Sequence, residues 1–530
     1  MLVGVLCAVA LLAPQDLVLE GAGVLTGTDS AWGPRVVVRD GRIAPPDAAA
    51  PDSAPVRKVP GVVLPGLHDA HAHLQGLGAA LENVDLVGTA SFAEVVERVQ
   101  ARAARTPVGE WVLGRGWDQN DWDDKAFPGH AALSAAVPDH PVWLVRVDGH
   151  AALANARAMA LADLTSATAT PAGGEILKDA AGAPTGVLID TAMGLVGGSL
   201  PQPGSAQLER QLLAAHDACL AVGLTCVHDA GMSSEQIDIV RRLWLQRRWK
   251  LRVYAMLPAA EVEAIRRGPW QTPDDVLIVR AVKGYADGAL GSRGAALLAP
   301  YSDQPGYRGL MITPRAGLQK LAQLCADTGF QLCVHAIGDA ANRAVLDAYA
   351  ATTFAHGARA ARFRIEHAQV VHPDDFVRFA SLGVLPSMQP THLTSDMPWA
   401  EARLGQDRIA GAYAWRRFLA LGLPLPCGTD FPVEGHDPRL TLFAAVTTRA
   451  PGGEVEMRPE QKLSRREALA GMTRDAAYAA FLERELGAIE PGMRADFTVF
   501  DRDPLVCAED EILHMKVLLT VIGGEVVYPR

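Results

Sequence analysis

A helix-then-strand pattern recurs through the middle of the chain. In each copy, an amphipathic segment is followed by a glycine, a short apolar run and a polar residue. Each glycine stands where the C-terminus of a helix favours a left-handed residue. Helices that alternate with nearly continuous apolar strands predict parallel βα units. The four clearest copies have their helical segments at Leu208–Val222, Leu318–Thr328, Phe376–Leu382 and Phe418–Leu421, followed by Gly223, Gly329, Gly383 and Gly422.

The polar residues of this pattern fall at the C-terminal ends of the predicted strands. They are His228, His335, Gln389 and Asp430. Both a (β/α)8 barrel and a doubly wound sheet carry their chemistry at that edge. A barrel is favoured, because the strand candidates run from Gly61 to about Asp430 and end on residues of metal-ligating type. We therefore predict an α/β protein whose central domain, residues 61–484, is a TIM-like (β/α)8 barrel.

The two ends of the chain have a β-type pattern instead. Asp16–Thr26 and Arg35–Ile43 are β-branched runs, and Ala495–Phe500 and Val517–Tyr528 match them at the far end. The dipeptides Asp40-Gly41 and Gly523-Gly524 are hairpin signals. The economical arrangement is one small β domain assembled from residues 1–60 and 485–530.

The tract from about residue 75 to residue 205 fits the helix-then-strand pattern poorly. It contains the segments Gly114–Asp124 and Val142–Asn155. We interpret it as an insertion into the barrel domain, and we expect it to lie over the barrel mouth.

Composition and charge exclude several classes of protein. The chain has 49 Lys and Arg against 60 Asp and Glu, a net charge of −11, which argues against a nucleic-acid partner. With 49% hydrophobic and 21% charged residues it is not a disordered chain. The 7 cysteines are odd in number and form no C-x-x-C motif, so neither a disulfide framework nor a thiolate zinc site is expected.

The apolar run Leu2–Ala13 is too short to span a bilayer, and no later segment reaches the roughly 20 residues that a spanning helix needs. No membrane span is therefore expected. The run resembles the apolar core of a signal peptide, but no Lys or Arg precedes it. An exported and a cytoplasmic protein both stay open, as does cleavage of residues 1–13.

The motif His71-Ala72-His73 ends the apolar run that begins at Val62. In a strand, residues i and i+2 point to the same face, so both imidazoles can meet one metal ion. An isolated pair of this kind is weak evidence, since paired histidines are often surface or core residues. At the end of the first predicted barrel strand, with other ligand types at later strand ends, packing explains the pair poorly.

Lys283 ends the apolar run Val276–Val282, so its ammonium group is expected to project into a largely apolar interior. Two arrangements make this tolerable. Lys283 pairs with a carboxylate such as Asp287, or its neutral amine takes up CO2 and becomes a carbamate that bridges two metal ions. Spacing alone favours the pair with a carboxylate.

His335 and His367 each end an apolar run. By strand parity His367 shares a face with Ile365, whereas Arg364 and Glu366 are predicted to face the helices. Neutral imidazole is a preferred ligand of zinc, and each ligand needs an outer hydrogen-bond partner. Either histidine alone is more often a core residue, but two at equivalent strand ends favour a metal site.

Asp430 ends the segment Pro426–Asp430, at the last predicted barrel strand. A carboxylate there can ligate a metal ion and can also accept a proton from the attacking water. The alternative is a helix N-cap.

Six residues of metal-ligating type thus fall at predicted strand ends, and the sequence around them resembles the amidohydrolase superfamily. The six are His71, His73, Lys283, His335, His367 and Asp430. The finer motifs resemble the amidohydrolase 3 branch, which includes proteins similar to N-substituted formamide deformylase. The resemblance runs from about Asp16 to Val527. Its motifs are LPGLHDAHAHL (64–74), RGWDQNDWDDKAFP (115–128), RVDGHAALAN (146–155), VKGYADGALGSRGA (282–295), VHAIGD (334–339), RIEHAQ (364–369) and GTDFPVE (428–434).

This resemblance implies a distorted (β/α)8 metal-dependent hydrolase barrel with a small β-sandwich, and one or two divalent metal ions, usually zinc. By that analogy His71 and His73 bind the first metal with Asp430. Lys283, if carboxylated, bridges to a second metal held by His335 and His367. Spacing alone favours an ion pair between Lys283 and a carboxylate, whereas the resemblance favours a carbamate on Lys283.

The function that follows is hydrolysis of an amide-type C–N bond, other than a peptide bond, in a small molecule. Asp430 takes the proton from the attacking water, and His150 or His228 donates to the oxyanion unless both are only structural. Trp117 and Asp118, in the insertion, are candidates to contact the substrate, although a tryptophan there also fits the core of the insertion. Arg293 is expected to receive a substrate carboxylate or to pair with Asp287.

Several alternatives stay open. The same ligands support lactone or ester hydrolysis and deamination of a cyclic amidine, because only the electrophile differs. A doubly wound oxidoreductase is disfavoured, since no G-x-G-x-x-G follows the first strand. A binding protein without catalysis is disfavoured because every expected ligand type is present. A homodimer is left open.

Overall fold

The computed structural model describes residues 15–28, 33–146, 151–171, 174–291, 293–354 and 357–529. The segment Leu2–Ala13 lies outside these residues. The chain divides into two compact units, one made of Gly78–Gln211 and the other of the remaining residues.

The larger unit contains a sheet of parallel strands that neighbour one another in chain order, as a βα barrel requires. The strands are β7 (Leu67–Ala72), β14 (Leu224–Asp229), β15 (Arg252–Pro258), β17 (Leu277–Tyr285), β18 (Gln331–Ala336), β19 (Arg364–His367) and β20 (Leu385–Ser387), and β16 (Trp270–Gln271) pairs with β17. Their residues are almost all buried on both faces, which explains why they appear in the sequence as continuous apolar runs. The predicted α/β barrel is confirmed.

The eighth position of the barrel is filled by residues 426–430 without a regular strand. On one side Met388 donates to Pro426 and Gly428 donates to Met388, both at 3.0 Å. On the other side Ala70 donates to Cys427 and Asp430 donates to His71, at 3.1 and 2.7 Å. Pro424 and Pro426 lack the N–H that a strand ladder needs, so the segment closes the ring with few hydrogen bonds.

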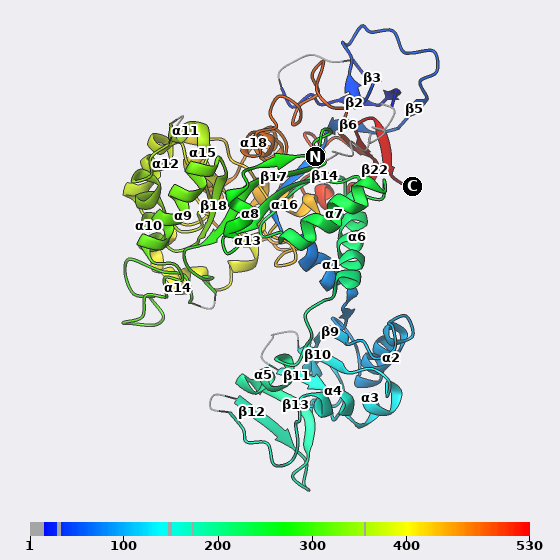
Figure 1. The fold of residues 1–530 in the computed structure, drawn as a ribbon, viewed down its shortest axis with the longest axis vertical. Helices are drawn as coiled ribbons and strands as arrows, with labels where there is room; N and C mark the ends of the chain where they lie inside the picture. Colours follow the sequence, from blue (N-terminus) through cyan, green and yellow to red (C-terminus); the bar gives the residue numbers. More distant parts are fainter. Residues whose placement is uncertain are drawn as a thin grey trace, which may run out of the picture. The chain divides into compact units, whose positions relative to one another are not determined.

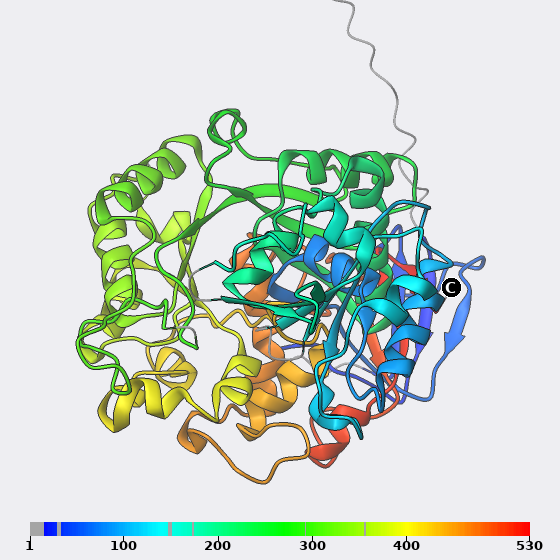
Figure 2. The same cartoon turned by 90° about the horizontal axis from the view of Figure 1, so that it is seen from below.

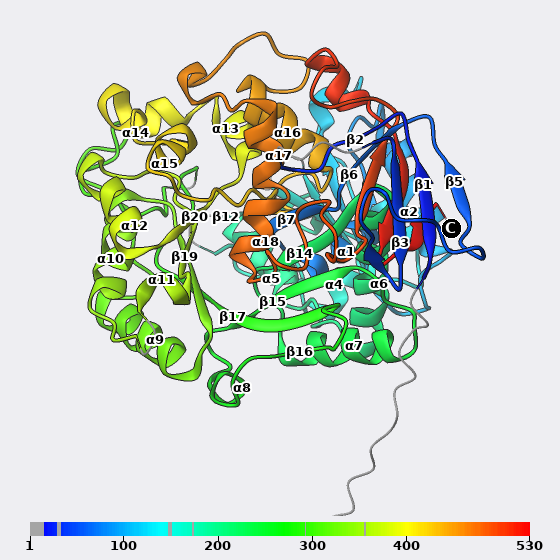
Figure 3. The same ribbon diagram turned by 90° about the horizontal axis from the view of Figure 1, so that it is seen from above.

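Helices cover the outside of the barrel (Figure 3), and the green and yellow ones form a curved outer row in Figure 2. Helices α1 (Leu74–Glu82) and α6 (Ser205–Ala221) each contain a boundary between the two units. The other helices of the larger unit are α7 (Ser234–Leu245), α8 (Val262–Arg266), α9 (Arg315–Thr328), α10 (Asp339–Ala350), α11 (Ala358–Ala361), α12 (Phe376–Leu382), α13 (Pro390–Asp396), α14 (Ala400–Ile409), α15 (Trp415–Ala420), α16 (Pro438–Thr447), α17 (Arg465–Gly471) and α18 (Arg474–Ala479). Single 3-10 turns lie at η1 (Gln119–Asp121), η2 (Thr191–Met193), η3 (Pro373–Asp375), η4 (Pro459–Gln461) and η5 (Asp510–His514). Gly329 and Gly383 end α9 and α12 with φ of 80° and 70°, as predicted.

Both ends of the chain build two further sheets. One has the order β4 (Arg42–Ile43), β3 (Arg35–Arg39), β1 (Leu17–Glu20) and β5 (Val56–Lys58). The other has the order β2 (Gly23–Val24), β6 (Val62–Pro65), β21 (Phe497–Phe500), β22 (Val517–Ile522) and β23 (Glu525–Tyr528). Side chains of the two sheets share one core, which includes Leu19, Val38, Val63, Phe497 and Val521. This is a β-sandwich.

The apolar run from Val62 to Ala72 is two strands, where a single first barrel strand was predicted. β6 pairs with β21 in the sandwich, and β7 pairs with β14 in the barrel. The chain passes from one sheet to the other at Gly66, whose N–H donates to Asp496.

The unit of residues 78–211 has its own mixed sheet of 6 strands (Figure 1, cyan). Its strands, in sheet order, are β12 (Gly174–Lys178), β13 (Pro184–Asp190), β11 (Ala151–Ala154), β10 (Val142–Arg146), β9 (Val112–Trp117) and β8 (Val84–Asp85), and its helices are α2 (Phe92–Ala103), α3 (Ala131–Ala136), α4 (Ala156–Leu161) and α5 (Gly194–Gly197). Leu153 packs into one apolar cluster and its neighbours Ala152 and Ala154 into another, so both faces of the sheet are covered. That these residues cover the barrel mouth stays a prediction.

Asn155 joins several elements of this unit, and its replacement by alanine is expected to destabilise the unit by about 3 kcal/mol. Its side-chain oxygen accepts from Ala158, as the N-cap of α4, and from Val142 in β10. Its amide donates to the carbonyls of Val137 and His140 at 3.1 and 2.9 Å. Asn155→Ala removes all four bonds in a buried place, and differential scanning calorimetry measures the loss.

Asn83→Ala is the matched control for this variant, because no hydrogen bond of the Asn83 side chain is present among the described residues. A transition of Asn155→Ala at the wild-type temperature would contradict the prediction.

None of the helices in the described part of the chain has both the length and the hydropathy needed to cross a membrane.

Candidate metal centre

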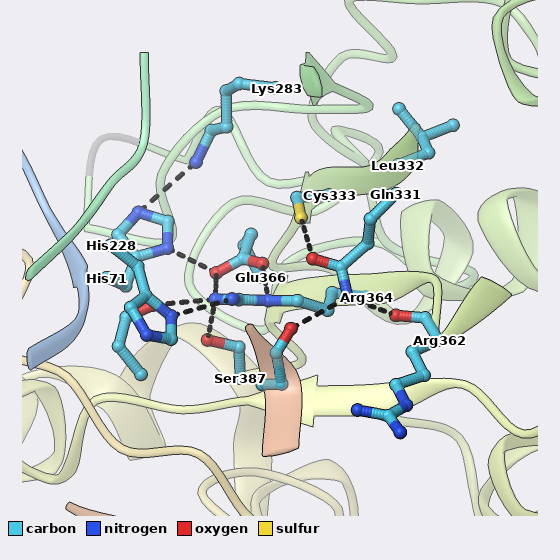
Figure 4. A network of polar contacts seen from close by, with 12 residues as sticks. His71, His228, Lys283, Gln331, Leu332, Cys333, Arg362, Arg364, Glu366 and Ser387 are labelled. Atoms are coloured by element: carbon cyan, nitrogen blue, oxygen red, sulfur yellow. Dashed lines mark hydrogen bonds and ion pairs between the residues drawn. The ribbon is translucent and has the colours of Figure 1, made fainter. Parts of the chain in front are cut away.

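His71, in β7, is held by a buried carboxylate (Figure 4). Its Nδ1 forms a short hydrogen bond with Glu366 Oε2, so the ring proton sits on Nδ1 and Nε2 keeps its lone pair. Arg364 donates to both oxygens of Glu366, at 2.7 and 2.9 Å. A carboxylate that orients an imidazole in this way is typical of a metal-ligating histidine.

Burial favours the neutral form of His71, His335 and His367, which is the form that binds metal. Burial, with a smaller contribution from the Lys283 charge, lowers the pKa of His71 to about 4 and that of His335 to about 3. Burial also lowers the pKa of His367 well below its usual value. His367 Nδ1 lies 2.7 Å from Gln389 Oε1, which fixes its proton as Glu366 fixes that of His71.

Asp430 is placed by a bond network at the closure of the barrel. Asp69 accepts from the N–H groups of His71 and Thr429, at 3.1 and 3.0 Å, and from the Thr429 hydroxyl at 2.6 Å. A side chain at Gly428 would lie 2.4 Å from His71 N and 2.6 Å from Asp69 Oδ1, so only glycine fits there. Asp430 itself has a φ of 62°, a left-handed conformation that turns its carboxylate toward the histidines.

The sequence-predicted ligands converge. Donor atoms of His71, His367 and Asp430 all lie within 4.8 Å of one another. His73 Nε2 lies 3.1 Å from Asp430 Oδ1, and the ring of His335 lies 4.5 Å from that of His367. Lys283 Nζ lies 3.2 Å from His71 Nε2. All six residues therefore gather at one end of the barrel.

These residues fit a divalent metal ion. Asp430 Oδ1 is buried without a hydrogen-bond partner in the described part of the chain, although it lies among the histidines. Burial alone would raise the pKa of Asp430, but the neighbouring His71 and His73 outweigh burial and hold this pKa below its usual range. Zinc prefers a donor set of an ionised carboxylate and neutral imidazoles whose orientation is fixed by hydrogen bonds to outer residues.

The prediction that Arg364 and Glu366 face the helices is wrong. Both side chains are fully buried in the network that holds His71. Strand parity fails because the regular strand ends at His367, whose φ is 74°, and Ala368 follows with 42°. The left-handed backbone at His367 lets its side chain reach the same site as that of its neighbour Glu366.

Lys283 does not pair with Asp287. The Asp287 oxygens accept from the N–H groups of Ala296, Ile337 and Gly338, at 2.8 to 3.0 Å. Within the described residues no carboxylate lies within ion-pair distance of the Lys283 ammonium group. Burial lowers the pKa of Lys283, which favours the neutral amine.

His228 lies one layer away from this centre, in β14. Arg364 donates to His228 Nδ1 at 3.1 Å, which places the ring proton on Nε2. His228, His68 and Cys226 also have donor atoms within 4.8 Å of one another. Because His228 Nε2 carries a proton and burial raises the pKa of the Cys226 thiol, this second group does not fit a divalent ion.

Each of the remaining candidates either makes contacts of its own or lies outside the described residues. His150 is among the latter. Trp117 is buried in the core of residues 78–211, donates to the Leu144 carbonyl at 2.9 Å and packs near Trp122, while Asp118 pairs with Arg146. Arg293 pairs with Asp303 through two bonds of 2.9 and 3.1 Å, and not with Asp287.

Two residues of the site carried no predicted role. Gln389 appeared only as a polar strand end, and it proves to orient His367. His392 lies one helical turn later and stacks on His367, with ring centroids 5.6 Å apart. The tetrapeptide Gln389-Pro390-Thr391-His392 has no metal-ligand spacing, so no sequence signal pointed to His392.

A parallel α/β barrel that gathers histidines, a lysine and an aspartate at its strand ends is the architecture of metal-dependent hydrolases. A family model described as "Amidohydrolase family" matches residues 61–528. The chain belongs to this family, as predicted.

Individual relatives agree. The chain is 32% identical to Protein LONG AFTER FAR-RED 3 of Arabidopsis thaliana, over 88% of this chain and 82% of that protein. It is 28% identical to N-substituted formamide deformylase of Arthrobacter pascens, over 97% and 99% of the two chains. The structure of an uncharacterized metal-dependent hydrolase from Pyrococcus furiosus matches with a TM-score of 0.77 and 27% identity, over 93% of this chain and 100% of that one.

Proposed function

We propose that this protein is a metal-dependent hydrolase that cleaves an amide-type C–N bond, other than a peptide bond, in a small molecule. The observation that carries the proposal is the convergence of His71, His367 and Asp430, with Glu366 and Gln389 fixing the imidazole protons from behind. The similarity to N-substituted formamide deformylase supports a C–N bond as the one cleaved.

His71, His73 and Asp430 would hold one divalent ion, and His335 and His367 a second, with Lys283 between them. Such ions, of which zinc suits the donors best, supply a Lewis acid for the substrate carbonyl and for the attacking water. Lys283, buried and without a carboxylate partner in the described residues, would add an oxygen ligand if its neutral amine took up CO2 as a carbamate.

Asp430 is proposed to move the proton. Its carboxylate is ionised and buried, and its Oδ1 accepts no hydrogen bond within the described residues, so it can accept a proton from water. The same carboxyl group then donates that proton to the leaving nitrogen. The left-handed backbone at Asp430 and its tie to Asp69 through Thr429 keep the carboxylate in place during both transfers.

Removal of divalent metal is expected to abolish hydrolysis and to lower the melting temperature. Bound metal stabilises the folded state only, by about 4 kcal/mol at a free concentration 1,000 times the Kd. Inductively coupled plasma mass spectrometry of the purified protein, then assays after chelation and after zinc addition, measure both effects. Protein that contains no divalent ion and keeps its activity in chelator would refute the proposal.

A substrate panel tests the bond that is cleaved. N-formyl, N-acetyl and N-acyl amino acid amides are compared with lactones and esters as controls, using metal-loaded protein. Turnover of amides at a kcat/KM at least tenfold above that of the lactones and esters is expected. The reverse order would favour the lactone or ester hydrolase.

A further inference from the structure

His392 lies beside the candidate metal centre on an element that already serves it. Helix α13 starts two residues after β20. Its N-cap residue Gln389 orients His367, and His392, one helical turn further on, contacts the same histidine. The His392 ring is nearly parallel to that of His367, with an angle of 18° between their planes. This stacking and the short connection to β20 hold the ring in one orientation.

The Nε2 atom of His392 faces the reacting part of the site. It lies 3.5 Å from Asp430 Oδ2, whereas Asp430 Oδ1 faces His71 and His73. The side chain is 11% exposed, and its Nε2 is a buried polar atom that makes no hydrogen bond to any described residue. Leaving such an atom unpaired costs free energy. We therefore expect the His392 Nε2 atom to form a hydrogen bond when substrate binds.

We propose that His392 is a catalytic residue whose Nε2–H donates a hydrogen bond to the substrate carbonyl oxygen as this oxygen becomes an anion. This inference rests on the proposed function. No bond to His392 forms or breaks, because its proton stays on Nε2 while Asp430 carries the proton of the water. A fixed donor aimed at developing charge stabilises the transition state more than the ground state.

His392 suits this role better than His228. His228 Nδ1 is taken by Arg364, and His228 belongs to the buried group that it forms with His68 and Cys226. His392 Nε2 lies next to the carboxylate that is proposed to meet both the water and the leaving nitrogen.

The test compares His392→Ala, His392→Gln and the control His514→Gln, all loaded with zinc. The Gln side chain can place an amide N–H near the position of Nε2, and His514 is exposed in η5. With the best amide of the panel, His392→Ala is expected to lower kcat by about 10²- to 10³-fold and to change KM by less than about threefold. His392→Gln is expected to recover at least tenfold over His392→Ala, and His514→Gln to match the wild type.

Binding and metal content give readouts that do not depend on turnover. Methylphosphonate, a tetrahedral anion, is expected to bind His392→Ala at least tenfold more weakly than wild type, while planar acetamide binds both alike, as measured by calorimetry. The zinc content of the variants is expected to equal that of wild type.

The failures of the two proposals are distinguishable. A wild-type protein that hydrolyses nothing in the panel refutes the proposed function. A wild type that is active, with both His392 variants within threefold of it, refutes the role of His392. Loss of zinc from folded His392→Ala would make His392 a ligand and would equally overturn its role as donor.

Discussion

Replacing Asp430 with asparagine is expected to lower kcat by about 10³-fold while the protein keeps its fold and most of its metal. Asparagine has nearly the same size, and one oxygen remains to face the histidines. It cannot accept a proton from water or return one to the leaving nitrogen, and no other described carboxylate lies within ion-pair distance of the Nε2 atoms of both His71 and His73. Steady-state kinetics, with metal analysis of the same samples, separates the loss of proton transfer from the loss of metal.

Asp374→Asn is the matched control for this variant. The Asp374 side chain is 83% exposed and forms an ion pair with His372 at the surface. The control is expected to keep wild-type kcat and metal content. Near wild-type turnover by Asp430→Asn would remove the proposed role of Asp430, and loss of metal with the activity would make Asp430 a ligand first and a base second.

The convergence of the six candidate ligands could be predicted from the sequence because parallel strands end at one edge of a barrel. His71, His335 and Asp430 stand far apart in the chain, yet each follows an apolar run that the barrel buries. The alternation of helix and strand gave both the fold class and the edge at which the polar residues meet. The last barrel segment, residues 426–430, was found in the same way although its prolines prevent a regular strand.

The residues that contact and orient the candidate ligands could not be predicted. Their positions depend on local backbone conformations, which the pattern of apolar and polar residues does not reveal. Glu366 and its neighbour His367 both reach the site because His367 and Ala368 are left-handed. His392 reaches the site because α13 starts two residues after β20. For Trp117 the sequence left two options, a substrate contact or the core of the insertion. The structure packs its ring in the core of residues 78–211, and a contact with substrate stays a prediction.

Replacing Glu366 with glutamine is expected to weaken zinc binding about 10- to 100-fold, the range seen when an outer partner of a metal ligand is lost. Glu366 accepts from His71 Nδ1 and from two nitrogens of Arg364. Glutamine offers one oxygen in place of two and turns an N–H toward one of these donors. His71 then loses the partner that keeps its proton on Nδ1, so the protonated and metal-binding nitrogens are no longer fixed.

The same change is expected to lower the free energy of unfolding by about 3 kcal/mol, because it leaves the Arg364 guanidinium buried without an anion. Urea unfolding of the metal-free protein measures this loss, and competition with a chelator measures the zinc affinity. Glu483→Gln is the control, since Glu483 also pairs with an arginine, Arg362, but both partners are partly exposed. We expect it to cost less than about 1 kcal/mol and to leave zinc affinity unchanged.

The two effects of Glu366→Gln separate the roles of the carboxylate. The stability loss comes from Arg364 and does not require metal, whereas the affinity loss comes from His71 and does. A folded Glu366→Gln protein with wild-type zinc affinity would show that His71 keeps its orientation without Glu366, and the carboxylate would then serve only to neutralise Arg364. Weakened zinc binding together with wild-type stability would instead show that the other acceptors of Arg364, the Ser387 hydroxyl at 2.8 Å and the Ala70 carbonyl at 2.7 Å, suffice to hold it.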